Sequence, residues 1–361
     1  MLKDIETQEF SGKIQTVLGE IPSSEVGITL PHEHLLLDMP VWFFESEDPE
    51  LKKLAYEPVA MEQLWWIWQH PFCNLDNLRL VDEQLVITEL MRFKQPGGNT
   101  VVDMTNQGLG RNPEALVRIS RATGLNIVMG TGYYVAEAQT PDYDVKTEEE
   151  IAQEIIGDIE DGVGKTRIRA GIIGEIGCSW PLAEREKKGL AAAAHAQRHT
   201  GAAINIHPGH NEHSPLEIAA FLLEAGADLN RVVISHLDRI IHPQSILKEL
   251  AAMGCYLEYD LFGSHMFNPI ARGYGKQPRP CDRERIEQIL ELITQGCLDQ
   301  ILMSHDMCMK IKLTRYGGPG YAHILINIVP QMLERGVTPE QIHTIMVENP
   351  MRLLTLRPDG E

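Results

Sequence analysis

Short apolar runs alternate with amphipathic segments along almost the whole sequence, and this alternation constrains the fold more than any other feature. Eight runs have the length and composition of buried strands, at 27–34, 100–104, 127–131, 170–175, 203–207, 231–236, 256–259 and 300–305. Helical spacing of apolar residues separates most of them, over 81–93, 113–123, 148–161, 183–200, 215–225, 244–253 and 283–295. This pattern predicts an α/β fold of the (β/α)8 or TIM-barrel type. A doubly wound sheet is disfavoured because no glycine-rich phosphate turn follows the first strand.

The length of 361 residues fits one such barrel with additions, so we expect a single domain over 1–361. The additions are a short β-ribbon at 11–18, a long insertion at 38–79 after the first strand, and a Gly- and Pro-rich loop at 261–280 over the barrel mouth. The insertion holds four tryptophans, which we expect in packing or in a subunit interface, with a ligand wall as the alternative.

Charge excludes two classes of partner. The chain has 32 Lys and Arg against 51 Asp and Glu, a formal charge of −19, which argues against binding to nucleic acid or to an anionic membrane surface.

No apolar run has the length of a transmembrane helix, and residues 1–10 lack a signal-peptide core. The six cysteines have no paired spacing. We therefore expect a soluble, cytoplasmic protein without a disulfide framework.

Metal-ligating residue types occur at the C-terminal ends of the predicted strands, where barrel enzymes hold their active sites. His32 and His34 are two positions apart on the first strand, so their side chains share one face. The remaining candidates, each at the end of a different strand, are Glu175, His207, His236 and Asp306. Imidazole nitrogens and carboxylate oxygens without thiolates are typical of a catalytic site for Zn, Mn, Fe, Co or Ni. The set is large enough for two divalent ions that share a bridging hydroxide.

Several motifs occur in an order that resembles the phosphotriesterase-related family of the amidohydrolase superfamily. They are TLPHEHLLLD at 29–38, VVDMTNQGLGRNP at 101–113, VMGTGYYV at 128–135, RAGIIGEIGCS at 169–179, NIHPG at 205–209, ISHLDR at 234–239, SHDM at 304–307 and YGGPGY at 316–321. The resemblance implies a barrel with a binuclear centre, with His32, His34 and Asp306 on the more buried ion and His207 and His236 on the more exposed one. Phosphotriesterase itself bridges its ions with a carbamylated lysine. Here no lysine occurs between Lys165 and Lys187, and Glu175 takes that place.

The resemblance and the ligand set together predict a binuclear metal-dependent hydrolase. We expect two divalent ions per chain, with zinc first among them, and a small-molecule carboxylic ester, lactone or amide as substrate. The bridging hydroxide would attack the carbonyl, and Asp306 would pass the proton to the leaving group. The alternatives are a phosphotriester hydrolase, a deaminase with a single metal ion, and a catalytically silent ligand-binding barrel.

Substrate contacts are predicted from residues that follow the strands. Arg239 and Arg315, with Lys310 and Lys312, could bind an anionic group on the substrate, and the alternative is that they are solvated or paired with acids. Tyr133 or Tyr134 could place a hydroxyl near the exposed metal, with Tyr133 slightly favoured, and the alternative is that both side chains pack in the core. The other polar residues near the strand ends, which we expect mainly in packing or supporting roles, are Asp103, Cys178, His210, His213 and His305. Many relatives of this family are dimers, so a homodimer is expected.

Overall fold

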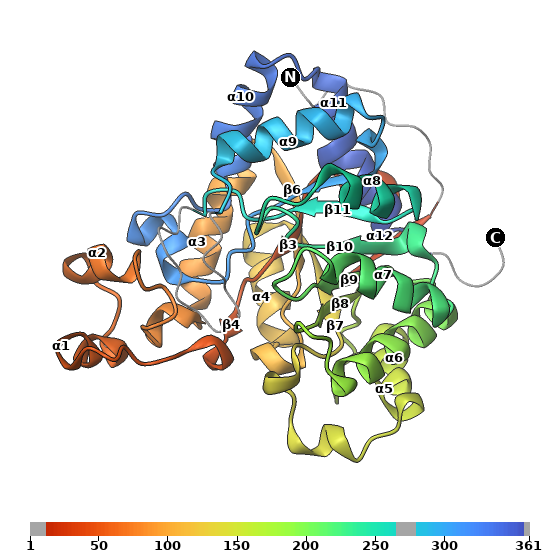
Figure 1. Ribbon diagram of the computed structural model, residues 1–361, viewed down its shortest axis with the longest axis horizontal. Coiled ribbons are helices and arrows are strands. Elements are labelled where there is room, and N and C mark those ends of the chain that lie inside the picture. Colours follow the sequence, from red (N-terminus) through yellow and green to blue (C-terminus); the bar gives the residue numbers. More distant parts are fainter. Residues whose placement is uncertain (1–11, 265–278, 357–361) are drawn as a thin grey trace.

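The computed structural model describes residues 12–264 and 279–356. At its centre is an eight-stranded parallel sheet whose spatial order follows the chain order (Figure 1). Its strands are β3 (Ile28–Glu33), β6 (Gly98–Asp103), β7 (Asn126–Thr131), β8 (Ile172–Gly177), β9 (Ile204–His207), β10 (Val232–Ile234), β11 (Tyr256–Tyr259) and β12 (Ile301–Met303). The two end strands meet, because the His32 N–H donates to Ser304 Oγ at 3.1 Å and the Asp306 N–H donates to the His32 carbonyl at 3.2 Å. The predicted (β/α)8 barrel is therefore confirmed.

Helices cover the outside of the sheet, as Figure 1 shows. Seven of them match the predicted segments: α3 (Glu83–Lys94), α4 (Pro113–Thr123), α5 (Glu148–Glu160), α6 (Glu184–Thr200), α7 (Ser214–Glu224), α8 (Gln244–Ala252) and α9 (Asp282–Thr294). Three short helices after β12 are absent from the prediction: α10 (Val329–Glu334), α11 (Pro339–His343) and α12 (Asn349–Leu354). Each begins with a proline in its first turn and is only five or six residues long. Such short segments do not show the long periodic spacing of apolar residues from which the other helices were predicted.

The predicted N-terminal ribbon is an antiparallel hairpin of β1 (Lys13–Thr16) and β2 (Gly19–Pro22). Its Ile14 is fully buried in an apolar cluster with Val102, Val128 and Leu302 from the barrel strands. Met351 of α12 belongs to the same cluster. The interior of the barrel is therefore filled with side chains that the hairpin and the C-terminal helix help to cover.

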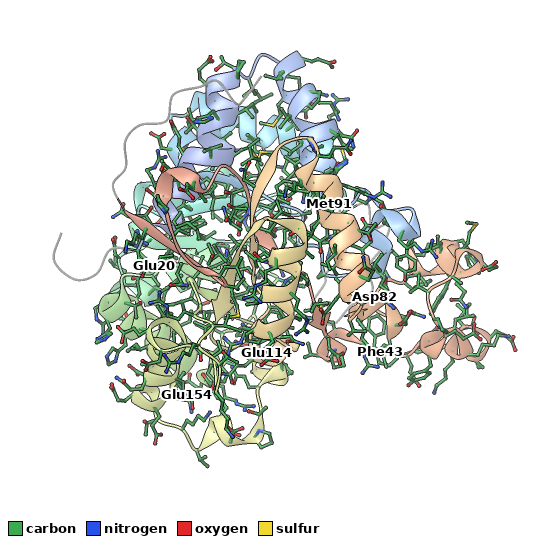
Figure 2. All side chains as sticks on the ribbon, turned by 180° about the vertical axis from the view of Figure 1, so that it is seen from behind. Glu20, Phe43, Asp82, Met91, Glu114 and Glu154 are labelled. Atoms are coloured by element: carbon green, nitrogen blue, oxygen red, sulfur yellow. The ribbon has the colours of Figure 1, made fainter. Side chains whose placement is uncertain are left out.

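The insertion after the first strand leaves the barrel between β4 (Leu37–Asp38) and β5 (Arg79–Leu80), which pair with each other. It carries the short helices α1 (Pro49–Lys52) and α2 (Leu64–Ile67) and projects to one side in Figure 1. Figure 2, drawn from behind, shows Phe43 on this projection and Glu114 and Glu154 on the outer helices. The predicted mouth loop at 261–280 lies largely outside the described residues. Within the described ranges, no helix is long and apolar enough to cross a bilayer.

Candidate metal centre

Glu175 on β8 lies at the centre of the predicted ligand set. Its Oε1 atom is 2.6 Å from His207 Nδ1 and 2.8 Å from His236 Nε2. The same oxygen is 3.8 Å from His32 Nε2, and Oε2 is 3.8 Å from His34 Nε2. One carboxylate thus faces four imidazoles that come from three different strand ends, with three ring nitrogens near Oε1 and one near Oε2.

The six predicted ligands form two groups of three. His34 Nε2 is 3.4 Å from Asp306 Oδ1, and His32 completes this trio. Glu175, His207 and His236 form the other trio. In each trio one ligand atom from every residue lies within 4.8 Å of the others. The structure therefore brings together the same two sets that the family resemblance implied.

One ring nitrogen in the first trio is buried without a partner. His32 Nε2 makes no hydrogen bond, while its Nδ1 lies 3.1 Å from Glu258 Oε2 and 3.2 Å from Ser235 Oγ. A buried nitrogen lone pair without a donor is costly, and a divalent cation would satisfy it. Because its ring is fixed from behind, as is usual for a metal-bound imidazole, the donor set fits such an ion.

Two acidic residues behind the histidines were missed by the sequence reasoning. Asp260 Oδ1 lies 2.7 Å from His236 Nδ1, and Glu258 contacts His32 as described. Thr105 Oγ1 makes the equivalent contact with His34 and lies 2.9 Å from its Nδ1. The signal for the acids was present: residues two positions apart on or just after a buried strand share its inward face. Buried charged side chains there need partners, and the histidines supply them.

Burial and close charges shift the ionisation of the centre. Burial disfavours the charged form of Glu175, but the adjacent His207 and His236 outweigh it and hold its pKa well below the ordinary value. Burial would lower the pKa of His236, yet Asp260 raises it to about 9. Burial also lowers the pKa of His207 to about 3, with Arg239 acting in the same direction and Glu175 opposing. The site therefore combines an ionised carboxylate with one neutral imidazole, and a neutral imidazole can ligate a metal.

Asp306 is held by the backbone around it. Glu33, between the two ligand histidines, points to the opposite side of β3, where its Oε1 accepts the His305 N–H at 3.0 Å and its Oε2 accepts the Met307 N–H at 3.0 Å. Asp306 itself adopts a left-handed φ of 49°, and His236 does the same at 55°. Such conformations cost about 1–3 kcal/mol in residues other than glycine and persist where the surroundings impose them.

Lys312 supports the same segment, which differs from its predicted contact with substrate. It is buried, and its ammonium donates to the His305 carbonyl at 2.7 Å and to the Asp306 carbonyl. Its charge, with His34, outweighs the burial of Asp306 and holds the pKa of that carboxyl far below its usual range. Asp306 is therefore ionised at neutral pH.

A cavity of about 40 Å³ opens over the two trios. Arg239 lines it, as predicted, and lies with its Nη1 3.3 Å from His207 Nε2. Arg279, Trp42 and Cys308 also line it, and none of these was assigned there from the sequence. The only early hint for Trp42 was the ligand-wall alternative for the insertion.

Other predicted contacts lie elsewhere. Tyr134, and not Tyr133, lines the cavity, with its hydroxyl 3.3 Å from His207 Nδ1. The Tyr133 hydroxyl instead donates to Glu154, and Lys146 donates to it at 3.2 Å. Arg315 is exposed and is not among the described residues that line the cavity.

The remaining candidates have supporting roles or lie outside the site. Lys310 pairs with Asp76 at 2.6 Å. His305 faces Glu33 and not the trios, as expected, and the exposed His213 lies 3.5 Å from Glu212. Asp103 accepts the Thr105 N–H at 2.9 Å and so positions the residue that contacts His34. Cys178 is buried and His210 stacks on Trp42.

Comparison with known proteins agrees with this geometry. The model of the phosphotriesterase family matches residues 12–354. A phosphotriesterase-related protein of Nematostella vectensis is 45% identical over 350 residues, which are 96% of this chain and 99% of that protein. An N-acetyltaurine hydrolase of Bos taurus is 41% identical over 351 residues, with the same coverage of 96% and 99%. The crystal structure of a resiniferatoxin-binding protein from Rhodobacter sphaeroides has a TM-score of 0.92 at 38% identity and covers 95% of each chain. This chain therefore belongs to the phosphotriesterase family of hydrolases.

Proposed function

We propose that the protein hydrolyses the amide bond of a small N-acyl amine that carries an anionic group, and that two divalent ions, with zinc as the first to test, occupy the two trios. The observation that carries this proposal is the convergence of both trios and two arginines, Arg239 and Arg279, on one cavity. Divalent ions held by His32, His34 and Asp306 and by Glu175, His207 and His236 would acidify water and polarise a carbonyl oxygen.

Asp306 is the group that holds the transferred proton. Its carboxylate lines the cavity, and its depressed pKa keeps it ionised when substrate arrives. Its Oδ1 faces His34 at 3.4 Å, while Cys308 Sγ lies 3.5 Å from Oδ2. A carboxylate at this position can accept a proton from water and release it to the leaving nitrogen, which an amine requires in order to depart.

The two arginines supply the preference for an anionic substrate. Arg239 is buried, and its Nη2 donates to the Pro208 carbonyl at 3.1 Å, so its position is fixed beside His207. A buried guanidinium in an active-site cavity suits a sulfonate or a carboxylate. The relatives called N-acetyltaurine hydrolases make N-acetyltaurine the first compound to test. A neutral phosphotriester has no anionic group for the Arg239 guanidinium to bind, and a binding protein without catalysis has no need of two metal trios.

The test is hydrolysis of N-acetyltaurine by the zinc-loaded protein, compared with N-ethylacetamide, which has the same skeleton without the sulfonate. One hydrogen-bonded charge contributes about 1.5–3 kcal/mol, so we expect kcat/KM to favour N-acetyltaurine by about 10–100-fold. Treatment with a chelator should abolish turnover, and added zinc should restore it. Equal rates on the two compounds would refute the role of the arginines. Turnover of neither compound at full metal loading would refute the proposed reaction.

A further inference from the structure

Two cavities of the structure share part of their lining. The cavity over the trios measures about 40 Å³, and a second one beside it measures about 280 Å³. Trp42 and His207 line both. By this measure the second cavity is about seven times larger than the first. Trp42 and His207 therefore form a wall that the two cavities share.

Contacts on several sides fix the indole of Trp42 in that wall. Its Nε1–H donates to the Tyr134 hydroxyl at 3.2 Å. Its rings lie almost parallel to the imidazole of His210, at 4° and 5.9 Å between centroids, and stack on His207 at 30° and 6.2 Å. The chain around Trp42 is a short 3-10 turn, Pro40–Trp42, that directly follows β4 and so starts from the paired base of the insertion. The hydrogen bond at its edge and the stacking on its face therefore fix the position of the Trp42 indole.

The second cavity has the chemistry of an apolar subsite. Val41, Val135 and Trp180 line it beside the polar Ser179 and His210, and among the described residues its lining contains one acid, Glu137, and no lysine or arginine. An anionic group would therefore not be favoured there, whereas an alkyl chain would be. Ser179 in this lining is held by Glu186, whose carboxylate accepts from the Ser179 N–H at 2.8 Å and from the Ser179 hydroxyl at 2.7 Å.

We infer that Trp42 determines specificity for the acyl group of the substrate, by separating the trios from an apolar cavity that would otherwise accept a longer chain. This inference rests on the proposed amide hydrolysis. In this proposal the acyl group sits in the small cavity over the trios. The indole blocks the path along which a longer acyl chain would reach Val41 and Val135. Removing the indole joins the two cavities and turns the apolar one into a binding site for the chain.

The experiment compares wild type, Trp42→Ala and Trp42→Phe on N-acetyl-, N-butanoyl- and N-octanoyltaurine. We expect the ratio of kcat/KM for the octanoyl over the acetyl substrate to rise by about tenfold or more in Trp42→Ala. The reason is that one methylene group bound in an apolar pocket changes kcat/KM by about tenfold or more. Trp42→Phe keeps a ring in the wall without the bond to Tyr134, and its ratio should stay near that of wild type. Adding Val41→Phe to Trp42→Ala refills the joined cavity and should reverse the gain. A merely structural role would lower kcat/KM for all chain lengths alike, and an unchanged ratio in Trp42→Ala would overturn the inference.

A binding measurement decides the point even if no amide is hydrolysed. Octanoate is titrated calorimetrically into zinc-loaded wild type and Trp42→Ala, with the circular dichroism spectrum as a check of folding. The inference predicts a Kd at least about tenfold lower in Trp42→Ala. Equal Kd values in the two folded proteins would overturn it, whereas absent hydrolysis with the predicted Kd difference would overturn only the proposed reaction.

Discussion

The guanidinium of Arg285 on helix α9 offers a direct test of what one buried ion pair contributes to this barrel. The side chain is fully buried, with Nε 2.7 Å from Asp238 Oδ2 and Nη1 2.9 Å from Asp282 Oδ1. Asp238 also accepts the backbone N–H groups of Asp260 at 3.2 Å and of Leu261 at 2.9 Å. Replacing Arg285 with methionine keeps an unbranched side chain and removes the charge. Two buried carboxylates then lose their shared cation.

The expected loss of stability is large. Breaking a buried pair by removing one partner costs about 3–5 kcal/mol, because the charge left behind is neither solvated nor paired. With an unfolding entropy of about 2.1 cal/mol/K per residue, this cost lowers the Tm of a chain of 361 residues by about 4–7 °C. Differential scanning calorimetry at pH 7 measures the shift.

The same helix provides a matched control. Arg283 Nε lies 2.8 Å from Glu287 Oε1, with nearly the same geometry, but the two side chains are 73% and 51% exposed. Water and salt screen such a pair, so Arg283→Met should leave the Tm within experimental error. Equal shifts in the two variants would refute the reasoning, because burial would then not decide the energy of the pair.

Four further predictions concern the site and its surroundings. Glu175→Ala should lose metal, measured as metal per chain by mass spectrometry, and retention of two ions would contradict its place between the trios. Asp306→Asn should lower kcat while retaining part of the metal, and full activity would exclude it as the proton acceptor. Arg239→Met should lower kcat/KM for N-acetyltaurine by about 10–100-fold, with a smaller loss on N-ethylacetamide, and equal losses would argue against anion binding. Burial would raise the pKa of Asp282, but its bonds to His323 and Gly263 hold it well below 3.8, so its contribution to stability is present above about pH 4 and is lost as the pH falls below that. Below pH 4 the urea midpoint of unfolding should therefore fall less steeply with pH in Asp282→Asn than in wild type. An equally steep fall in both proteins would contradict a stabilising role of the ionised Asp282.

The barrel and the clustering of the candidate ligands were predictable, because strand periodicity and the position of the strand ends determine both. Strand residues alternate between two faces, so His32 and His34 had to share one, and parallel strands place all their C-terminal ends on one side. The family motifs then grouped the ligands. The structure adds the short distances from the Glu175 carboxylate to His207 and His236, which show that these three side chains lie together.

The surroundings of the trios were harder to predict because they depend on contacts between residues far apart in sequence. Nothing local distinguishes Tyr133 from Tyr134 after β7 has ended, since the alternation of faces stops with the strand. Lys312 follows Asp306 closely, which suggested the mouth, yet it turns back to the carbonyls of its own segment. Trp42 reaches the cavity from the insertion, and the sequence pattern of that segment does not indicate where it packs.

The contact of Glu33 with the segment around His305 has a consequence for how the enzyme is made. These residues are 272 positions apart, and their contact lies where the first strand meets the last. Bringing such distant segments together carries a high entropic cost, so this junction belongs to the slow, non-local part of folding. The trio of His32, His34 and Asp306 spans the same junction. A chain still on the ribosome therefore cannot complete this set of candidate ligands until residue 306 has emerged and the first and last strands have met.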